Sequence, residues 1–171
     1  MDDFGIKYTD KKDIEELLSI MSKWYRTKTD WKGSSFGGIT LEWNYQGERW
    51  VELSLPEYIK KVLHQFSHQT PARPQDSPHP APVAKFSRAT PKPPTPADAP
   101  RLDKTGVRKI QRINGCCLWY MWACNSTTCK ALNAIGHKQA NATTQTNHWA
   151  LWLLDYLATH PDGNVCTVHD K

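Results

Sequence analysis

Apolar side chains in the first 66 residues recur with the spacing of strands and helices. Phe4–Tyr8 alternates apolar with small or charged residues and predicts a β-strand, after which Thr9 and Asp10 can cap a helix. The next apolar positions recur at i, i+3, i+4, i+7, i+10 and i+11, which predicts an amphipathic helix with one buried stripe. These positions are Ile14, Leu17, Leu18, Met21, Trp24 and Tyr25.

A β-hairpin and a second helix are predicted to follow a Gly- and Ser-rich loop. Alternating apolar residues run from Ile39 to Tyr45 and from Val51 to Leu55, with a turn around Gly47. Ser54 and Glu57 have the spacing of a capping box, and the helix after them carries Tyr58, Ile59, Val62, Leu63 and Phe66. The predicted order for residues 1–66 is strand, helix, hairpin, helix.

The rest of the chain divides into a proline-rich linker and a helical region. Ten of the 12 prolines lie between Pro71 and Pro100, so residues 67–105 are predicted to be a semi-rigid polyproline II spacer. The motif PKPPTP within it could alternatively be a ligand for an SH3 or WW domain. Residues 106–160 show three helical patterns, and residues 161–171 read as a strand at the start of a further domain.

The helical patterns also predict which side chains are buried. In the first helix Ile110, Ile113, Cys117, Tyr120 and Met121 share one side, and a Ser126 or Thr127 cap precedes the second. In the third helix we expect the face made by Trp149, Trp152, Leu153, Tyr156 and Leu157 to pack in the core. The predicted fold class is α+β.

Composition restricts the class of protein. An odd number of cysteines, four of them within a helical region, favours reduced thiols, and no C-x2-C pair is present to suggest zinc. His64 and His68 are four residues apart, but with no third ligand nearby we expect exposed residues at a helix end. The chain has no basic-then-apolar leader and no apolar run near 18 residues, so we expect an intracellular protein, cytoplasmic or nuclear, that neither is secreted nor spans a membrane.

The net charge of +5 suits an anionic partner, and it is unevenly distributed. Residues 1–66 carry 10 basic and 11 acidic side chains, so the positive excess lies after them. The densest basic cluster consists of Lys104, Arg108, Lys109 and Arg112, which either contacts phosphates or forms a solvated helix surface. In the hairpin, Trp43, Tyr45, Arg49 and Trp50 either contact nucleic acid or pack against the sheet.

Several motifs in order resemble the reverse transcriptase of copia-type LTR retrotransposons. MDDFGIKY resembles the x-D-D hairpin of the catalytic palm, and WKGSSFGGITLEWNYQGERWVELSLPEYIKKVLHQF is similar to the Gly loop, strand pair and L-S-x-x-x-Y-I helix that follow it. RINGCCLWYMWACNSTTCKAL resembles the I-x-G-x-L-x-Y block, and HWALWLLDYLATHPDGNVCTVH resembles the helix and strand that lead to ribonuclease H. The resemblance implies a partial palm over 1–66, a thumb- or connection-like segment over 106–160 and a truncated ribonuclease H-like start over 161–171.

The resemblance also implies chemistry and partners. In such polymerases two Mg²⁺ ions about 3.5 to 4 Å apart stabilise the attacking and leaving oxygens, and carboxylates hold them. By resemblance Asp2 and Asp3 are the catalytic and metal-binding pair, Mg²⁺ is the cofactor, and an RNA or DNA template–primer duplex is the partner. The third aspartate and the fingers normally lie upstream, so we expect this chain to be an inactive fragment. The missing upstream polymerase region and the downstream ribonuclease H region could be further partners.

Two alternatives to an enzyme fragment remain. The chain could be a non-catalytic remnant that binds nucleic acid through the hairpin and the C-terminal helices. It could also be the non-functional product of a decayed element, in which case an exposed sheet edge at Phe4–Tyr8 would favour aggregation.

Overall fold

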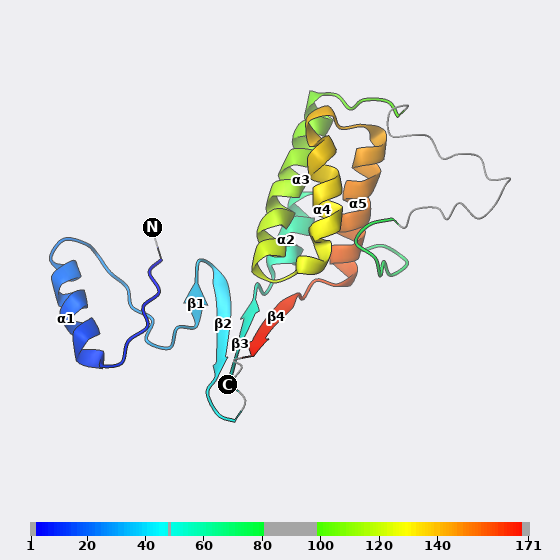
Figure 1. Cartoon of the computed structure of the whole chain (residues 1–171). Helices are drawn as coiled ribbons and strands as arrows, with labels where there is room; N and C mark the ends of the chain where they lie inside the picture. Colours follow the sequence, from blue (N-terminus) through cyan, green and yellow to red (C-terminus); the bar gives the residue numbers. More distant parts are fainter. Residues whose placement is uncertain (1–2, 48, 81–98, 169–171) are drawn as a thin grey trace. The chain divides into compact units, whose positions relative to one another are not determined.

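The computed structural model describes residues 3–47, 49–80 and 99–168, and it contains both helices and a four-stranded sheet (Figure 1). This mixture agrees with the predicted α+β class. The chain forms two compact units. The N-terminal unit comprises Met1–Leu53 with Cys166–Lys171, and the helical unit comprises Ser54–Val165.

Helix α1, Lys11–Ser22, confirms the first predicted helix and its cap. The Asp10 side chain accepts a hydrogen bond from the Lys12 backbone N–H at 2.9 Å. The predicted buried stripe is wrong, because no residue of α1 is buried, and of the stripe residues Leu17 is 37% and Trp24 is 80% exposed. The 3.6-residue period identifies a face that can be buried, but a packing surface is also needed to bury it.

Phe4–Tyr8 is not the predicted strand. The backbone there is irregular and Phe4 is 80% exposed, since a strand forms only where a neighbour accepts and donates the ladder hydrogen bonds. A short strand that the pattern did not predict, β1 (Ser35–Phe36), lies within the predicted loop instead. Gly37 and Gly38 follow it with φ of 58° and 82°, the left-handed values that a two-residue type I′ hairpin turn requires.

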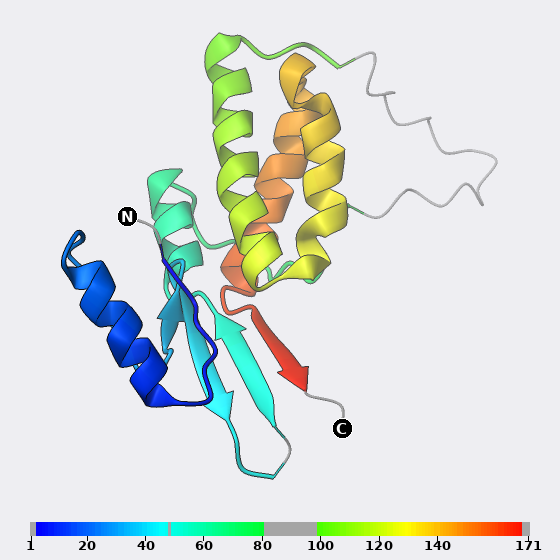
Figure 2. The ribbon, with the colours of Figure 1, turned by 60° about the vertical axis from the view of Figure 1, so that its left-hand side comes forward.

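The sheet has the strand order β1-β2-β3-β4 (Figure 2). Strand β2, Ile39–Asn44, pairs antiparallel with β1 in the register Ser35↔Thr40 and Phe36↔Ile39. Strand β3, Trp50–Ser54, completes the predicted hairpin, and β4, Asn164–Val168, is the strand predicted near the end of the chain.

Helix α2, Tyr58–Gln65, forms as predicted but without the predicted capping box. Ser54 lies in β3, and the N-cap residue is Glu57 in the left-handed conformation, φ 62°, with no side-chain cap. The Glu57 carboxylate instead contacts Lys60 Nζ at 2.5 Å. Tyr58 Oη donates a hydrogen bond to the Cys116 carbonyl, so α2 belongs to the helical unit and the compact division differs from the predicted boundary after residue 66.

The helical unit contains the three helices predicted in the second half of the chain (Figure 1). They are α3 (Lys104–Ala123), α4 (Cys129–Lys138) and α5 (Thr144–Thr159), with short 3-10 turns η1 (Ser126–Thr128) and η2 (Gln139–Asn141) on either side of α4. The predicted Ser126 or Thr127 cap is wrong because both residues lie inside η1, where Asn125 precedes the turn. Most of the predicted core is confirmed, because six of its side chains are no more than 1% exposed: Ile110, Ile113, Cys117, Tyr120, Leu153 and Leu157. Ile135 and Leu154 are equally buried although the pattern did not single them out, whereas the predicted Met121 is only half-buried.

Parts of the predicted linker belong to the helical unit. At its C-terminal end, the Leu102 N–H donates to the Ala142 carbonyl, and Asp103 caps α3 by accepting from the Gly106 N–H at 2.8 Å. At its N-terminal end, residues 75–80 lie along α5 and form side-chain contacts with it. Both ends of the predicted spacer therefore contact the helical unit, and residues 81–98, with PKPPTP, lie outside the described residues.

Candidate nucleic-acid interface

The four basic residues predicted to contact phosphates lie on α3 and are exposed. Lys104, Arg108 and Arg112 are spaced i, i+4 and i+8, so they form one column along the helix, with Lys109 beside it. Within the part of the chain that the structure describes, none of the four is in an ion pair with a carboxylate. Their positive charge is therefore available to an external anion.

Three of these residues line a hollow of about 410 Å³ between α2 and α3. Its described lining contains no carboxylate and consists of Gln65, Phe66, Ser67, Thr105, Arg108, Lys109 and Arg112. The Arg112 guanidinium carbon lies 5.7 Å from the centre of the Phe66 ring, a cation–π contact that orients the guanidinium. Phe66 was predicted only as a packing residue, because the sequence does not show that the end of α2 meets the start of α3.

The same face of α3 changes from basic to aromatic toward its C-terminal end. Trp119 and Trp122 follow Arg108 by 11 and 14 residues, about three and four helical turns, and they are 44% and 78% exposed. Sequence reasoning did not identify these residues as functional. The signal available in the sequence was that both residues are large and apolar but lie outside the buried stripe of α3.

The hairpin residues lie in the N-terminal unit, where Trp43 has structural partners. Trp43 Nε1–H donates to the Gly33 carbonyl at 2.7 Å, and its ring stacks on Tyr45 with centroids 6.0 Å apart. Tyr45 is 71% exposed and Arg49 is exposed, whereas Trp50 is half-buried. Trp43 therefore holds the loop around Gly33, while Tyr45 and Arg49 are exposed to solvent.

Of the predicted carboxylate pair, Asp3 is described and Asp2 lies outside the described residues. Asp3 Oδ2 accepts a hydrogen bond from the Gly37 N–H at 2.6 Å, which fastens the start of the chain to the β1–β2 turn. Among the described residues no group of three His, Cys, Asp or Glu side chains could hold a metal ion. The predicted Mg²⁺ site at Asp2 and Asp3 therefore stays a prediction.

Two buried thiols of the helical unit, those of Cys117 and Cys124, do not have the character of nucleophiles. Burial, with a smaller contribution from Cys116, raises the pKa of Cys117 to about 12, and burial also raises the pKa of Cys124. All five cysteines are free, and Cys166 is exposed. Burial likewise raises the pKa of the Tyr58 and Tyr120 phenols.

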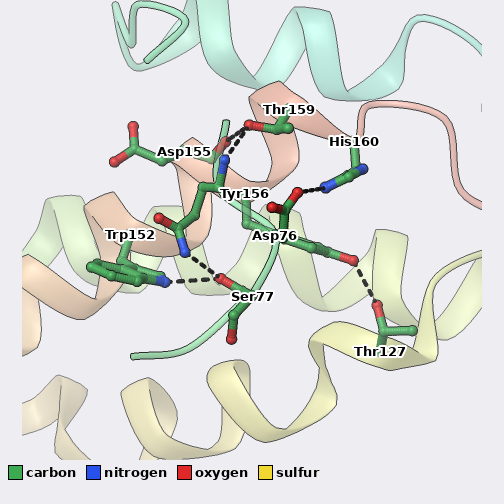
Figure 3. A network of polar contacts seen from close by, with 9 residues as sticks. Asp76, Ser77, Thr127, Trp152, Asp155, Tyr156, Thr159 and His160 are labelled. Atoms are coloured by element: carbon green, nitrogen blue, oxygen red, sulfur yellow. Dashed lines mark hydrogen bonds and ion pairs between the residues drawn. The ribbon is translucent and has the colours of Figure 1, made fainter. Parts of the chain in front are cut away.

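The described end of the proline-rich stretch is bound to α5 by a network of polar contacts (Figure 3). We call residues 75–80 the strap. Trp152 Nε1–H donates to the Ser77 carbonyl at 2.8 Å, the Gln75 N–H donates to Thr159 Oγ1 at 3.0 Å, and Asp76 pairs with His160 at 3.3 Å. The prediction that Trp149, Trp152 and Tyr156 pack in the core is therefore wrong in part, because all three are only half-buried.

His68 is also bound to α5, contrary to the prediction of an exposed residue. Its Nε2 lies 2.8 Å from Asp155 Oδ1 and its side chain is only 13% exposed. His64 is exposed as predicted. The two histidines differ because the chain turns at Ser67, φ 52°, and directs His68 toward α5.

No helix in the described ranges has the length and apolar character needed to cross a membrane. Comparisons of the chain with protein-family models, with curated proteins and with solved structures found no match.

Proposed function

We propose that the chain is the C-terminal part of a copia-type reverse transcriptase domain, and that it holds nucleic acid on the exposed face of α3 without itself catalysing nucleotidyl transfer. The observation that carries the proposal is the column of Lys104, Arg108 and Arg112, with Lys109 beside it, next to a hollow whose described lining has no carboxylate. The four segments that resemble copia-type reverse transcriptase motifs occur in the same order as in that family, which supports the proposed origin of the chain.

The geometry of this face suits a phosphate backbone. Lys104, Arg108 and Arg112 are separated by about 6 Å per step along the helix axis, from 1.5 Å of rise per residue. Each side chain is long enough to adjust to a phosphate, and the hollow beside α2 leaves room for the sugar–phosphate chain. Contacts of this type bind DNA or RNA without reading the base sequence.

The exposed tryptophans extend the same face with a different chemistry. Trp119 and Trp122 offer ring faces on which unpaired bases can stack, and such stacking contributes about 1–3 kcal/mol per base. A template with a single-stranded extension would thus contact the basic half of α3 through its duplex and the aromatic half through its unpaired bases. Trp122→Ala should weaken binding of the extended template by about tenfold and leave binding of a blunt duplex unchanged.

Binding is tested by fluorescence anisotropy with a labelled RNA–DNA duplex over a series of salt concentrations. Four phosphate contacts predict a log–log salt slope of about −3.6, at about −0.9 per contact. The triple variant Arg108→Gln, Lys109→Gln, Arg112→Gln should reduce the slope to about −0.9. A slope near zero for the natural chain would refute binding through phosphates.

The matched control removes the same charge from the N-terminal unit. Lys12→Gln, Lys23→Gln, Lys28→Gln changes three exposed lysines and lowers the net charge equally. This variant should keep the natural slope. An equal loss in both triple variants would show that only net charge matters, and the α3 site would be rejected.

Catalysis is tested by primer extension on a poly(rA) template with an oligo(dT) primer and Mg²⁺. We expect no incorporation by the natural chain or by the Asp2→Asn, Asp3→Asn double variant. Incorporation that the double substitution abolishes would refute the non-catalytic part of the proposal and would leave the binding part unaffected.

A further inference from the structure

The strap is a proline-rich peptide seated on an aromatic helix face within the chain's own helical unit. We propose that the face of α5 formed by Trp149, Trp152 and His160 is a binding groove for proline-rich peptides of the pattern Asp-Ser-Pro-x-Pro. The strap occupies this groove in the same chain, and a peptide of that pattern from another protein can take its place. This inference does not rest on the nucleic-acid site of α3.

Two hydrogen bonds in the groove recognise backbone atoms of the peptide. Trp152 Nε1–H donates to the carbonyl of Ser77, and Thr159 Oγ1 accepts from the N–H of Gln75, two residues earlier (Figure 3). Thr159 is oriented for this contact because its hydroxyl donates to the Asp155 carbonyl at 2.9 Å. Neither contact depends on the peptide's being covalently part of the chain.

Proline favours the peptide conformation that such contacts need. Ser77 precedes Pro78, and a residue before proline is restricted to extended or polyproline II conformations. The bound peptide therefore loses little conformational entropy. A tryptophan N–H that donates to a backbone carbonyl, beside aromatic side walls, fits the way in which polyproline II peptides are bound by aromatic-lined grooves.

Side-chain contacts add selectivity for the residues around the two prolines. Asp76 pairs with His160 at 3.3 Å, and the His79 ring lies 5.3 Å from the Trp149 ring. His160 is itself supported by Tyr156, with ring centroids 5.0 Å apart. The carboxylate before the Ser-Pro pair and a planar side chain between the prolines are thus the features the groove recognises.

The strap can leave without disrupting the core beneath it. None of its residues is buried, and the Asp76 side chain remains 85% exposed. An exposed pair of this kind contributes little to stability, whereas the core side chains Leu153, Leu154 and Leu157 of α5 are fully buried. The strap is therefore expected to open locally while the helices stay folded.

The test uses the full chain with the strap disabled by Asp76→Gly, Pro78→Gly and His79→Gly. A fluorescein-labelled peptide with the natural sequence of residues 72–80, ARPQDSPHP, is titrated with this variant and with the natural chain, and anisotropy is measured. We expect saturable binding to the variant and about tenfold weaker binding to the natural chain, because the tethered strap competes at an effective concentration in the millimolar range. A peptide with both prolines of the S-P-H-P run replaced by glycine should bind about tenfold less tightly than the natural one.

The role of the Trp152 indole N–H in peptide binding is tested by Trp152→Phe in the strap-disabled chain. Phenylalanine keeps an aromatic ring but lacks the donor, so peptide affinity should fall by about tenfold. The matched control is Trp24→Phe, which changes a tryptophan that is 80% exposed in the N-terminal unit and should leave the affinity unchanged. Equal affinities for the two variants would overturn the assignment of Trp152.

Folding of the strap-disabled chain is checked by circular dichroism. If its helical signal is intact and the peptide does not bind, the proposal is refuted. If the helical signal is lost, the peptide is titrated into the natural chain instead and binding is followed by NMR. Comparison with the spectrum of the Trp152→Phe variant assigns the indole N–H resonance of Trp152. Peptide at millimolar excess should shift that resonance, and an unmoved resonance would refute the proposal.

Discussion

Gly163, just before β4, is the position at which one added methyl group should destabilise the helical unit most clearly. A Cβ atom built there would lie 2.5 Å from Tyr120 Oη and 3.0 Å from Asn125 Cβ. Tyr120 is 1% exposed and its hydroxyl donates to the Pro161 carbonyl at 3.0 Å. The hydroxyl cannot move away from the methyl group without weakening that hydrogen bond.

Gly163→Ala is therefore expected to lower the free energy of unfolding by about 2 kcal/mol. Overpacking a well-filled site costs about 1–3 kcal/mol, and a weakened hydrogen bond of the buried hydroxyl costs about 1 kcal/mol at most. The measurement is urea unfolding followed by circular dichroism at 222 nm, where the midpoint should fall and the slope with denaturant should stay constant.

The matched control is Gly115→Ala in the middle of α3. An added Cβ there has no heavy atom within 4 Å, and the residue is exposed, so the higher helix propensity of alanine should stabilise the protein by about 0.5–1 kcal/mol. Both substitutions add one methyl group to a glycine, but their expected effects on the free energy of unfolding have opposite signs.

A double-mutant cycle identifies the cause of the effect. In a Tyr120→Phe background the atom that the methyl group would meet first is absent, so Gly163→Ala should cost about 1 kcal/mol or less, which implies a coupling of about 1–2 kcal/mol. The reasoning is refuted if Gly163→Ala is as harmless as Gly115→Ala, or if its cost is unchanged when the hydroxyl is removed.

Three further predictions concern the cap, the core and the thiols of the helical unit. Asp103→Ala should lower the free energy of unfolding by about 1 kcal/mol, because it removes the side chain that caps α3; an unchanged thermal midpoint would count against the cap. Ile113→Ala should cost about 2–5 kcal/mol in urea unfolding, whereas Leu118→Ala, on the exposed side of α3, should stay within about 0.5 kcal/mol; similar losses would mean that the core is wrongly placed. At pH 8 iodoacetamide should modify Cys166 quickly and Cys117 only on unfolding, as read by mass spectrometry, because burial raises the pKa of Cys117 to about 12. This folded-state pKa lies above the ordinary thiol value of 9.0, so the thiol's contribution to stability is complete below about pH 9 and declines at higher pH by up to about 1.4 kcal/mol per pH unit. A melting temperature that stays constant from pH 8 to pH 11 would contradict the burial.

The helices of the second half could be predicted from local pattern because their buried stripes are long and regular. Ile110, Ile113 and Cys117 recur at helical spacing over two turns of α3, and the structure buries all three. The basic residues of the candidate interface were also predicted, because charged residues on the opposite side of such a helix are exposed. The lining contributed by Phe66 could not be predicted, since it depends on where α2 ends relative to α3.

Predictions failed where an element needs a distant partner. Phe4–Tyr8 has the alternation of a strand, but its backbone is not paired in a sheet. Ser54 and Glu57 have the spacing of a capping box, but Ser54 continues β3. In both cases the local signal was present and the tertiary hydrogen bonds determined the outcome.

The sequence by itself determined the periodic elements: the hairpin of β2 and β3, the helices α1 to α5, and the basic side of α3, because spacing and charge are local properties. Only the tertiary structure decided that residues 75–80 of the proline-rich segment are bound to α5. The contact between Ser77 and Trp152 joins residues 75 positions apart, and its partners are a backbone carbonyl and an indole N–H. Every residue has a backbone carbonyl, so no pattern of residue types can reveal which one an exposed donor on α5 will bind.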